Sequence, residues 1–246
     1  MKEAIIYLLA ITAAEVVTVF VQPVWGIVCH AIVLVVVVVH SALATDYRYR
    51  NLVLSLALVP LVRIISLGMP LVDIPQIWWY PIIYAPLLAA AIMVVRILGL
   101  RAREVGFSFG SFPVQLAVAL SGLLFGVIEY LILTPEPLVI EFTWQEVWLP
   151  ALIFLVGTGF VEEFIFRGVL QRTAVEALGG RRGIIYVSLL FTIMHIGFLS
   201  LIDVVFVFVV ALFFGWVVKK TGSLFGVTLA HGITNIMLYL VVPFLF

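Results

Sequence analysis

The chain has 246 residues, of which 65% are hydrophobic and only 11% are charged, and its formal net charge is zero. The mean hydropathy of +1.31 is far above soluble globular usage and indicates a polytopic membrane protein. The balanced charge argues against a nucleic-acid partner. A single cysteine, Cys29, excludes an internal disulfide and a cysteine-based metal site.

Nine apolar runs follow one another along the chain, each near the roughly 20 residues that a membrane helix needs. They cover residues 4–21, 24–44, 51–67, 77–98, 113–133, 148–171, 183–198, 202–218 and 223–245. We therefore expect an all-α, polytopic membrane helix bundle with about eight or nine transmembrane helices. The first run, which Glu15 interrupts, is the one whose crossing of the membrane the sequence supports least.

The connections between these runs alternate in charge, and this predicts the orientation of the chain. The N-terminus and the connections after the even-numbered runs carry basic residues, whereas the other connections carry only acidic ones. The basic residues are Lys2, Arg48, Arg50, Arg101, Arg103, Arg172, Arg181, Arg182, Lys219 and Lys220. Because basic connections mark the cytoplasmic side, we expect an integral protein of the cell membrane with a cytoplasmic N-terminus.

The segment FVEEFIFRGVLQ, residues 160–171, places three ionisable residues inside the sixth apolar run. A charge at the centre of a membrane helix costs about 2.5–3.5 kcal/mol, so each of the three needs a partner or a function. Glu163 and Arg167 are four residues apart with the acid first, which predicts an ion pair on one helix face. Four residues after Glu162 stands the apolar Phe166, so the Glu162 carboxyl has no ion-pair partner at that spacing. This unpaired carboxyl is a candidate general base.

Two later runs carry further polar residues at a similar depth. His231 and Asn235 are four residues apart and share a helix face, and His195 lies in the seventh run. At 1.5 Å per residue, the distance from the cytoplasmic side is about 9 Å for Glu162, 18 Å for His195, 12 Å for His231 and 18 Å for Asn235. We expect these four side chains to line one buried polar cavity.

Glu15 and Arg63 form a second predicted contact within the membrane. On the same count both lie about 18 Å from the cytoplasmic side. We expect them to form an ion pair that holds the first and third runs together.

The set formed by Glu162, His195, His231 and Asn235 suits peptide hydrolysis. That reaction needs an activated water, a proton carrier and donors for the oxyanion. Glu162 with His195 beside it can position and deprotonate water, while His231 and Asn235 can donate to the oxyanion. No Ser or Cys stands in a comparable position beside a His, which disfavours covalent catalysis.

Three other interpretations of these residues stay open. Two His and one Glu could bind zinc in a metal-dependent membrane hydrolase, but HExxH is absent and Asn is a poor zinc ligand. We therefore favour water activation without a metal and expect no cofactor. The polar set could also only join helices, or bind a ligand in a non-catalytic immunity-type protein or a transporter.

Three motifs in order resemble the CAAX prenyl endopeptidase and bacteriocin-processing (CPBP) family of glutamate-type intramembrane proteases, which includes the Ras-converting CAAX endopeptidase. They are EEFIFRGVLQ, beginning at Glu162, Phe191-x-x-x-His195 and His231-x-x-x-Asn235. The resemblance covers residues 155–240. It implies an all-helical fold with a cavity that opens to the cytoplasmic side.

Carried over to this chain, the resemblance implies that Glu162 activates the water molecule and that His195 assists Glu162. His231 and Asn235 would stabilise the oxyanion, and Glu163 with Arg167 would be the supporting ion pair. Metal would not be needed. The alternative within the family is a non-catalytic bacteriocin-immunity-type protein.

The resulting prediction is an intramembrane endopeptidase that cleaves near the end of a membrane-associated protein or peptide, whether prenylated or not. Its expected partners are membrane lipid and that substrate. We interpret residues 1–246 as a single membrane domain, in which 1–112 are N-terminal helices without an assigned role and 113–246 form the catalytic core.

Overall fold

The computed structural model describes residues 2–245, which form a bundle of helices with no strand in that range. Within these residues, eight helices are long and apolar enough to cross a membrane, so the chain is a polytopic helical membrane protein, as its composition predicts. The α-helices are α1 (Lys2–Phe20), α2 (Pro23–Leu43), α3 (Tyr47–Leu56), α4 (Leu58–Gly68), α5 (Trp79–Ile97), α6 (Phe112–Leu133), α7 (Trp144–Phe154), α8 (Gln171–Leu178), α9 (Gly180–Ile193), α10 (Leu201–Thr221) and α11 (Phe225–Ile236).

Short helical segments of other winding complete the chain. They are η1 (Gln76–Trp78), η2 (Ala102–Val105), η3 (Leu155–Glu162), η4 (Phe164–Leu170), η5 (Ile196–Phe198), η6 (Met237–Val241) and η7 (Val242–Phe244). Among them η3, η4 and η6 are π-helical. Local sequence explains two helix starts: Asp46 accepts hydrogen bonds from the backbone N–H groups of Arg48 and Tyr49, and the Ser200 hydroxyl accepts from the backbone N–H of Asp203 at the start of α10.

The expectation of about eight or nine spans is confirmed, with eight candidate spans among residues 2–245, and the predicted run that falls short is the seventh. The first run forms α1, which is itself a candidate span. The seventh run forms α9, which has only 14 residues and is about 21 Å long at 1.5 Å per residue. The helix ends at Ile193 because the chain turns before α10, with Leu199 in the left-handed region at a φ of 57°. His195 therefore lies in a turn rather than inside a helix.

The segment that carries the two consecutive glutamates belongs to one long helix over Trp144–Leu178. Its middle is π-helical through η3 and η4, and such winding often occurs at functional sites. Helix α11 crosses η3 closely at Gly159, where a Cβ would lie 2.7 Å from the Thr228 carbonyl oxygen. A larger residue at position 159 would push α11 away from the glutamates.

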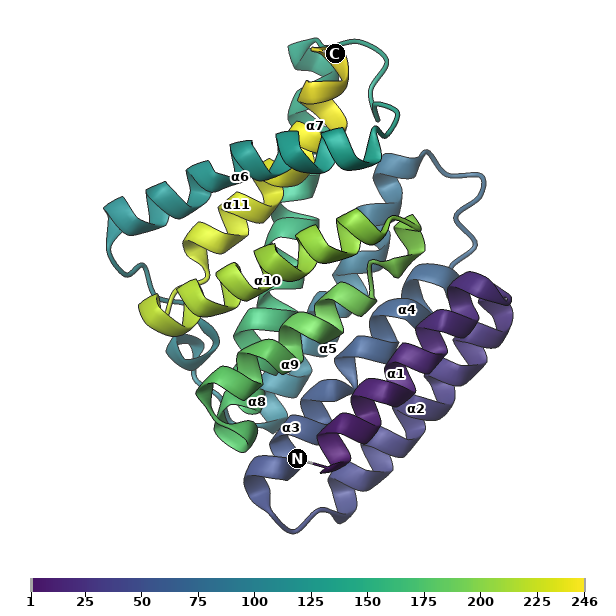
Figure 1. Cartoon of the computed structure of the whole chain (residues 1–246), viewed down its shortest axis with the longest axis vertical. Coiled ribbons are helices and arrows are strands. Elements are labelled where there is room, and N and C mark those ends of the chain that lie inside the picture. Colours follow the sequence, from purple (N-terminus) through teal and green to yellow (C-terminus); the bar gives the residue numbers. More distant parts are fainter. Residues whose placement is uncertain (1, 246) are drawn as a thin grey trace.

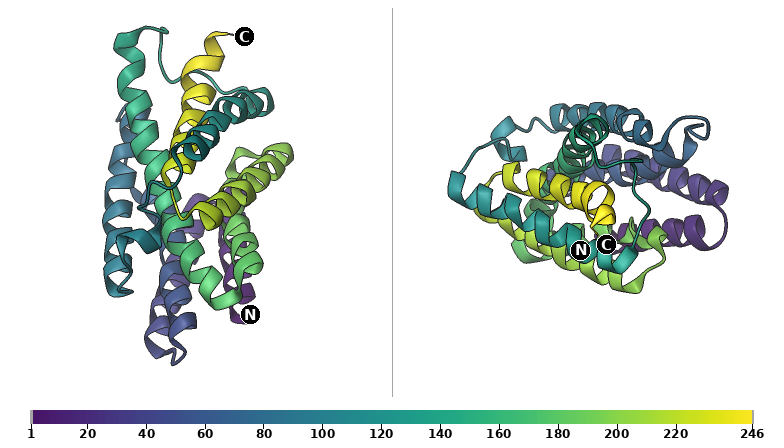
Figure 2. Two further views of the ribbon diagram at one scale, coloured as in Figure 1. Left: turned by 90° about the vertical axis from the view of Figure 1, so that its left-hand side faces the viewer. Right: turned by 90° about the horizontal axis from the view of Figure 1, so that it is seen from above.

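Figure 1 shows the arrangement of the helices. Helices α1 and α2 lie side by side along one flank with α4 next to them, and α6 and α11 run alongside each other at the other end of the molecule. Helices α9 and α10 lie between these two groups. The start of α1 lies towards one end of the longest axis and η7 lies at the other, as the side view in Figure 2 also shows.

One large hydrophobic cluster runs through the bundle. It includes Ile11 of α1, Leu52 of α3, Leu87 of α5, Ile165 of η4 and Leu190 of α9, all fully buried. The outer faces carry many exposed apolar side chains, which is the pattern expected where helices face lipid. The cluster joins the N-terminal helices to the segment with the glutamates, so both halves of the chain share one core.

Candidate active site

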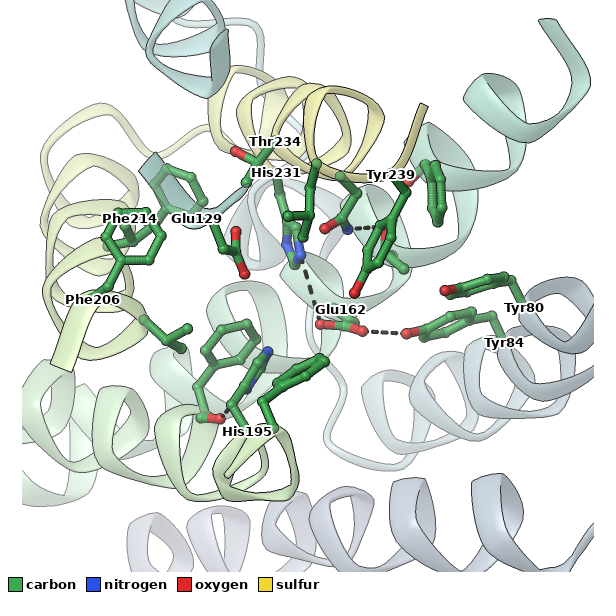
Figure 3. Close-up of a pocket in the computed structure, with 18 residues that line it drawn as sticks. Tyr80, Tyr84, Glu129, Glu162, His195, Phe206, Phe214, His231, Thr234 and Tyr239 are labelled. Atoms are coloured by element: carbon green, nitrogen blue, oxygen red, sulfur yellow. Dashed lines mark hydrogen bonds and ion pairs between the residues drawn. The ribbon is translucent and has the colours of Figure 1, made fainter. Parts of the chain in front are cut away.

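A cavity of about 180 Å³ lies among α5, η3, α6, α10 and α11 (Figure 3). The four residues predicted to converge, Glu162, His195, His231 and Asn235, all line it. Its other polar or hydroxyl-bearing residues are Tyr80, Tyr84, Glu129, Thr158, Thr234 and Tyr239. Side chains that are far apart in the sequence are thus brought to one polar hollow inside an apolar bundle.

Glu162 stands at the end of η3 with its carboxyl in the cavity. Its side chain is 19% exposed, whereas that of the neighbouring Glu163 is fully buried. The Tyr84 hydroxyl donates a hydrogen bond to Oε1 of Glu162. Oε2 lies 3.9 Å from Nε2 of His231, a separation that is too long for a hydrogen bond (Figure 3).

Glu163 organises the wall behind the cavity. Its Oε1 accepts from Nη1 of Arg167 at 2.8 Å, which confirms the predicted i,i+4 ion pair, and from Nδ1 of His231 at 2.9 Å. The guanidinium carbon of Arg167 also lies 4.2 Å from the centre of the Phe191 ring, an arrangement that favours a cation. Because an ionised carboxylate can only accept, Nδ1 of His231 carries a proton and Nε2 faces the cavity.

His195 reaches the cavity from the turn after α9. Its Nδ1 lies 2.8 Å from the carbonyl oxygen of Phe191. A carbonyl only accepts, so Nδ1 carries the proton and Nε2 of the neutral ring is left as an acceptor. The preceding carbonyl, that of Met194, accepts a hydrogen bond of 2.7 Å from Nη2 of Arg63, and this contact fixes the turn.

Asn235 lines the cavity one helical turn after His231, as the spacing predicts. Its Nδ2 donates to the Thr158 hydroxyl at 2.7 Å, and that hydroxyl donates to the Phe154 carbonyl at 2.9 Å. The amide is therefore anchored to the long glutamate helix. It keeps a second N–H that can serve another acceptor.

Several cavity residues were not predicted from the sequence. Glu129 lies near the end of α6 and lines the cavity beside His231 (Figure 3). Tyr80 and Tyr84 lie near the start of α5, where aromatic residues usually mark the membrane interface. An ionisable residue within a span was the one available signal for Glu129. The tyrosines carried no comparable signal.

The predicted pair of Glu15 and Arg63 is also present, away from the cavity centre. Nε of Arg63 donates to Oε1 of Glu15 at 2.7 Å, and Nε2 of His30 lies 3.2 Å from the same oxygen. Glu15 and His30 are fully buried. The pair joins α1 to α4, as expected for the first and third runs.

The donor set was also considered for metal binding. Within residues 2–245, no group of three or more His, Cys, Asp or Glu side chains is arranged to hold a metal ion. The nearest such pair in the cavity is Glu162 and His231, with Oε2 of the glutamate 3.9 Å from Nε2 of the histidine.

One family model matches part of the chain. Residues 142–237 match the model of the type II CAAX prenyl endopeptidase Rce1-like family. No curated protein and no solved structure matches the chain. The matched segment contains all six residues predicted for the site, so this part of the chain is similar to the CAAX prenyl endopeptidases.

Proposed function

We propose that the chain is an intramembrane endopeptidase in which the Glu162 carboxylate activates a water molecule. The family is one of membrane proteases, and this supports a proteolytic activity. The observation that carries the proposal is the convergence of Glu162, His195, His231 and Asn235 on one cavity. The substrate in this proposal is a membrane-associated protein or peptide that is cleaved near its end.

In the proposed reaction, Glu162 and His195 act on the water. Nε2 of neutral His195 accepts a hydrogen bond from the water and orients it, while Glu162 takes its proton as the oxygen attacks the peptide carbonyl carbon. The tetrahedral intermediate then collapses and the C–N bond breaks. Glu162 returns the proton to the leaving nitrogen, so the products are a carboxyl end and an amine.

His231 and Asn235 are the proposed donors to the oxyanion. The free N–H of the Asn235 amide can donate while the other remains on Thr158. Nε2 of His231 faces the same cavity and donates to the oxyanion when the ring carries both protons. Glu163 holds the opposite edge of that ring, and Arg167 in turn holds Glu163, so the ion pair supports the site without entering it.

We further propose a location in the cell membrane with the N-terminus in the cytoplasm. Contacts among the predicted cytoplasmic connections support this. Glu104 lies 3.5 Å from Arg172, and the Ser108 hydroxyl donates to the Gly222 carbonyl at 2.6 Å. Connections that were grouped by their basic residues therefore lie at one side of the bundle, which is the arrangement that the positive-inside rule requires.

A cleavage assay in detergent tests the function. Wild-type protein and Glu162→Gln would be incubated with prenylated and unprenylated C-terminal peptides, with and without a chelator. We expect cleavage by the wild type that ignores the chelator and disappears in Glu162→Gln. Glu141→Gln, which removes an exposed loop carboxylate, is the matched control and should cleave normally.

The other outcomes separate the alternatives. Cleavage that the chelator abolishes would support a metal-dependent hydrolase instead. Undiminished cleavage by Glu162→Gln would refute the role of Glu162. Binding of the peptides by wild-type protein without any cleavage would favour the non-catalytic, immunity-type alternative.

A further inference from the structure

Two cavities meet at Glu162. The second, of about 300 Å³, lies on the side of α4 and α5, and Arg63, Ser66 and Gln76 are among its polar lining residues. The residues that line both cavities are Tyr80, Tyr84, Glu162, Phe191, His195 and Phe198. The two tyrosines of α5 therefore border Glu162 in both cavities.

Tyr84 makes the most direct contact with the glutamate. Its hydroxyl donates to Oε1, and among the residues that the structure describes it is the only hydrogen-bond donor to this carboxyl. The other oxygen, Oε2, points towards His231. The contact thus gives the two oxygens of one carboxyl different tasks, since one is held by the phenol and the other faces the histidine.

The ring of Tyr84 is itself held in place. Tyr80 stacks against it with an interplanar angle of 9° and a distance of 6.4 Å between ring centres. On another side lies Gly157 of η3, where a Cβ would be only 3.2 Å from Cδ2 of Tyr84. The helix that carries Glu162 therefore contacts Tyr84 at two points: Gly157 lies against the ring, and the Glu162 carboxyl accepts from the hydroxyl.

We propose that Tyr84 is a positioning residue of the active site, which orients the Glu162 carboxyl so that Oε2 is presented to water. The inference rests on the proposed function of Glu162. It adds α5 to the catalytic unit, although α5 lies outside residues 142–237 and within the N-terminal segment that had no assigned role.

The physical reason lies in the freedom of a carboxyl group. The terminal torsion of a glutamate is broad and two-fold, so an unanchored carboxyl samples many orientations. A hydrogen bond from a phenol to a carboxylate is charge-assisted and restricts that torsion. With Oε1 fixed, the lone pairs of Oε2 point in a defined direction, and proton abstraction depends on such geometry.

Infrared spectroscopy of the full chain in detergent tests the contact without requiring turnover. The carboxyl bands that disappear in Glu162→Gln belong to Glu162. We expect these bands to shift in Tyr84→Phe and to stay in place in Tyr80→Phe, which removes a hydroxyl from the neighbouring ring of the same cavity. Bands that are identical in wild type and Tyr84→Phe would overturn the proposal, whatever the activity of the protein.

Kinetics distinguish positioning from a purely structural contact. Loss of a charge-assisted hydrogen bond predicts about a 10- to 100-fold lower kcat in Tyr84→Phe, with KM within about twofold of wild type. A contact that only ties α5 to η3 would lower the thermal midpoint and leave kcat of the folded fraction unchanged. If Glu162→Gln abolishes cleavage while Tyr84→Phe keeps the wild-type kcat, the role of Tyr84 fails and that of Glu162 stands.

Discussion

The bundle contains two clusters of buried charge, and they differ in what their carboxylates face. In the first, which we call the Glu15 cluster, Glu15 is fully buried and its Oε1 faces both Arg63 and His30. In the second, the Glu162 cluster, a fully buried carboxylate, Glu163, likewise faces an arginine and a histidine through one oxygen. The second cluster differs by one added residue, Glu162, whose side chain is 19% exposed to a cavity.

This difference shows how a membrane protein can hold a reactive carboxylate. A buried carboxylate that is paired with a cation is not available for proton transfer, because separating the pair would leave a buried charge without compensation. Glu15 and Glu163 are both in that position. Glu162 remains available for proton transfer because Glu163 neutralises the charge of Arg167 and accepts a hydrogen bond from His231. Two consecutive glutamates thus divide a structural task from a proposed chemical one.

Glu162→Gln should produce the largest effect and should act on activity alone. Loss of a general base lowers the rate by roughly 10²–10⁴-fold. The side chain keeps its size, its amide oxygen can still accept from Tyr84, and Glu162 makes no ion pair shorter than 3.9 Å, so the thermal midpoint in detergent should stay close to that of wild type. A variant that unfolds at a clearly lower temperature would show that Glu162 is structural, as Glu15 is.

Glu163→Gln should reverse this pattern. It leaves Arg167, which is 3% exposed, without a counter-charge, and removing one partner of a buried pair typically costs about 3–5 kcal/mol. We expect a much lower free energy of unfolding, measured by denaturant titration in mixed micelles. Residual activity should also fall, since a neutral amide oxygen replaces the carboxylate that accepts from Nδ1 of His231. A stability equal to that of Glu162→Gln would contradict the division of tasks.

The Glu15 cluster gives a smaller effect because Arg63 is 19% exposed in its side chain. Glu15→Gln, Arg63→Gln and the double variant form a cycle, from which we expect a coupling energy of roughly 1–3 kcal/mol. The unfolding free energies of the four proteins provide that coupling. A coupling near zero would mean that the contact between α1 and α4 does not stabilise the bundle.

The sequence predicted much of this comparison, since charges inside apolar runs are expensive and therefore informative. Spacing alone indicated the pair of Glu163 and Arg167, and depth indicated that Glu15 could meet Arg63. The end of α9 at Ile193 was missed because its apolar run continues through the turn at His195, where only the backbone conformation reveals the end of the helix.

The contacts between helices could not be predicted from the sequence, for a different reason. The distance from Glu163 to His231 and the contact of Tyr84 with Glu162 depend on how α11 and α5 pack against η3. Helical periodicity gives the face of a residue but not the partner of that face. The π-helical winding of η3 and η4 also changes which residues share a face, and no residue pattern predicted it.

Glu104 carries a third kind of charge, exposed at the surface, and its removal should have the smallest effect on stability. Glu104 accepts from the backbone N–H of Arg101 at 2.9 Å and lies 3.5 Å from Arg172. The hydrogen bond with Arg101 and the nearby Arg172 lower the pKa of Glu104. Because the folded-state pKa is below the unfolded one, the stabilisation exists above the unfolded pKa and is lost as pH falls through the folded value.

Glu104→Gln should therefore lower the thermal midpoint slightly at neutral pH, and the difference from wild type should vanish in acid. Added salt should reduce the difference as well, since water and ions screen exposed pairs. Glu136→Gln, another exposed carboxylate, serves as the control and should show neither trend. A neutral-pH effect as large as that of Glu163→Gln would mean that exposure does not separate the three kinds of charge, because Glu104 is solvated whereas Glu163 is enclosed.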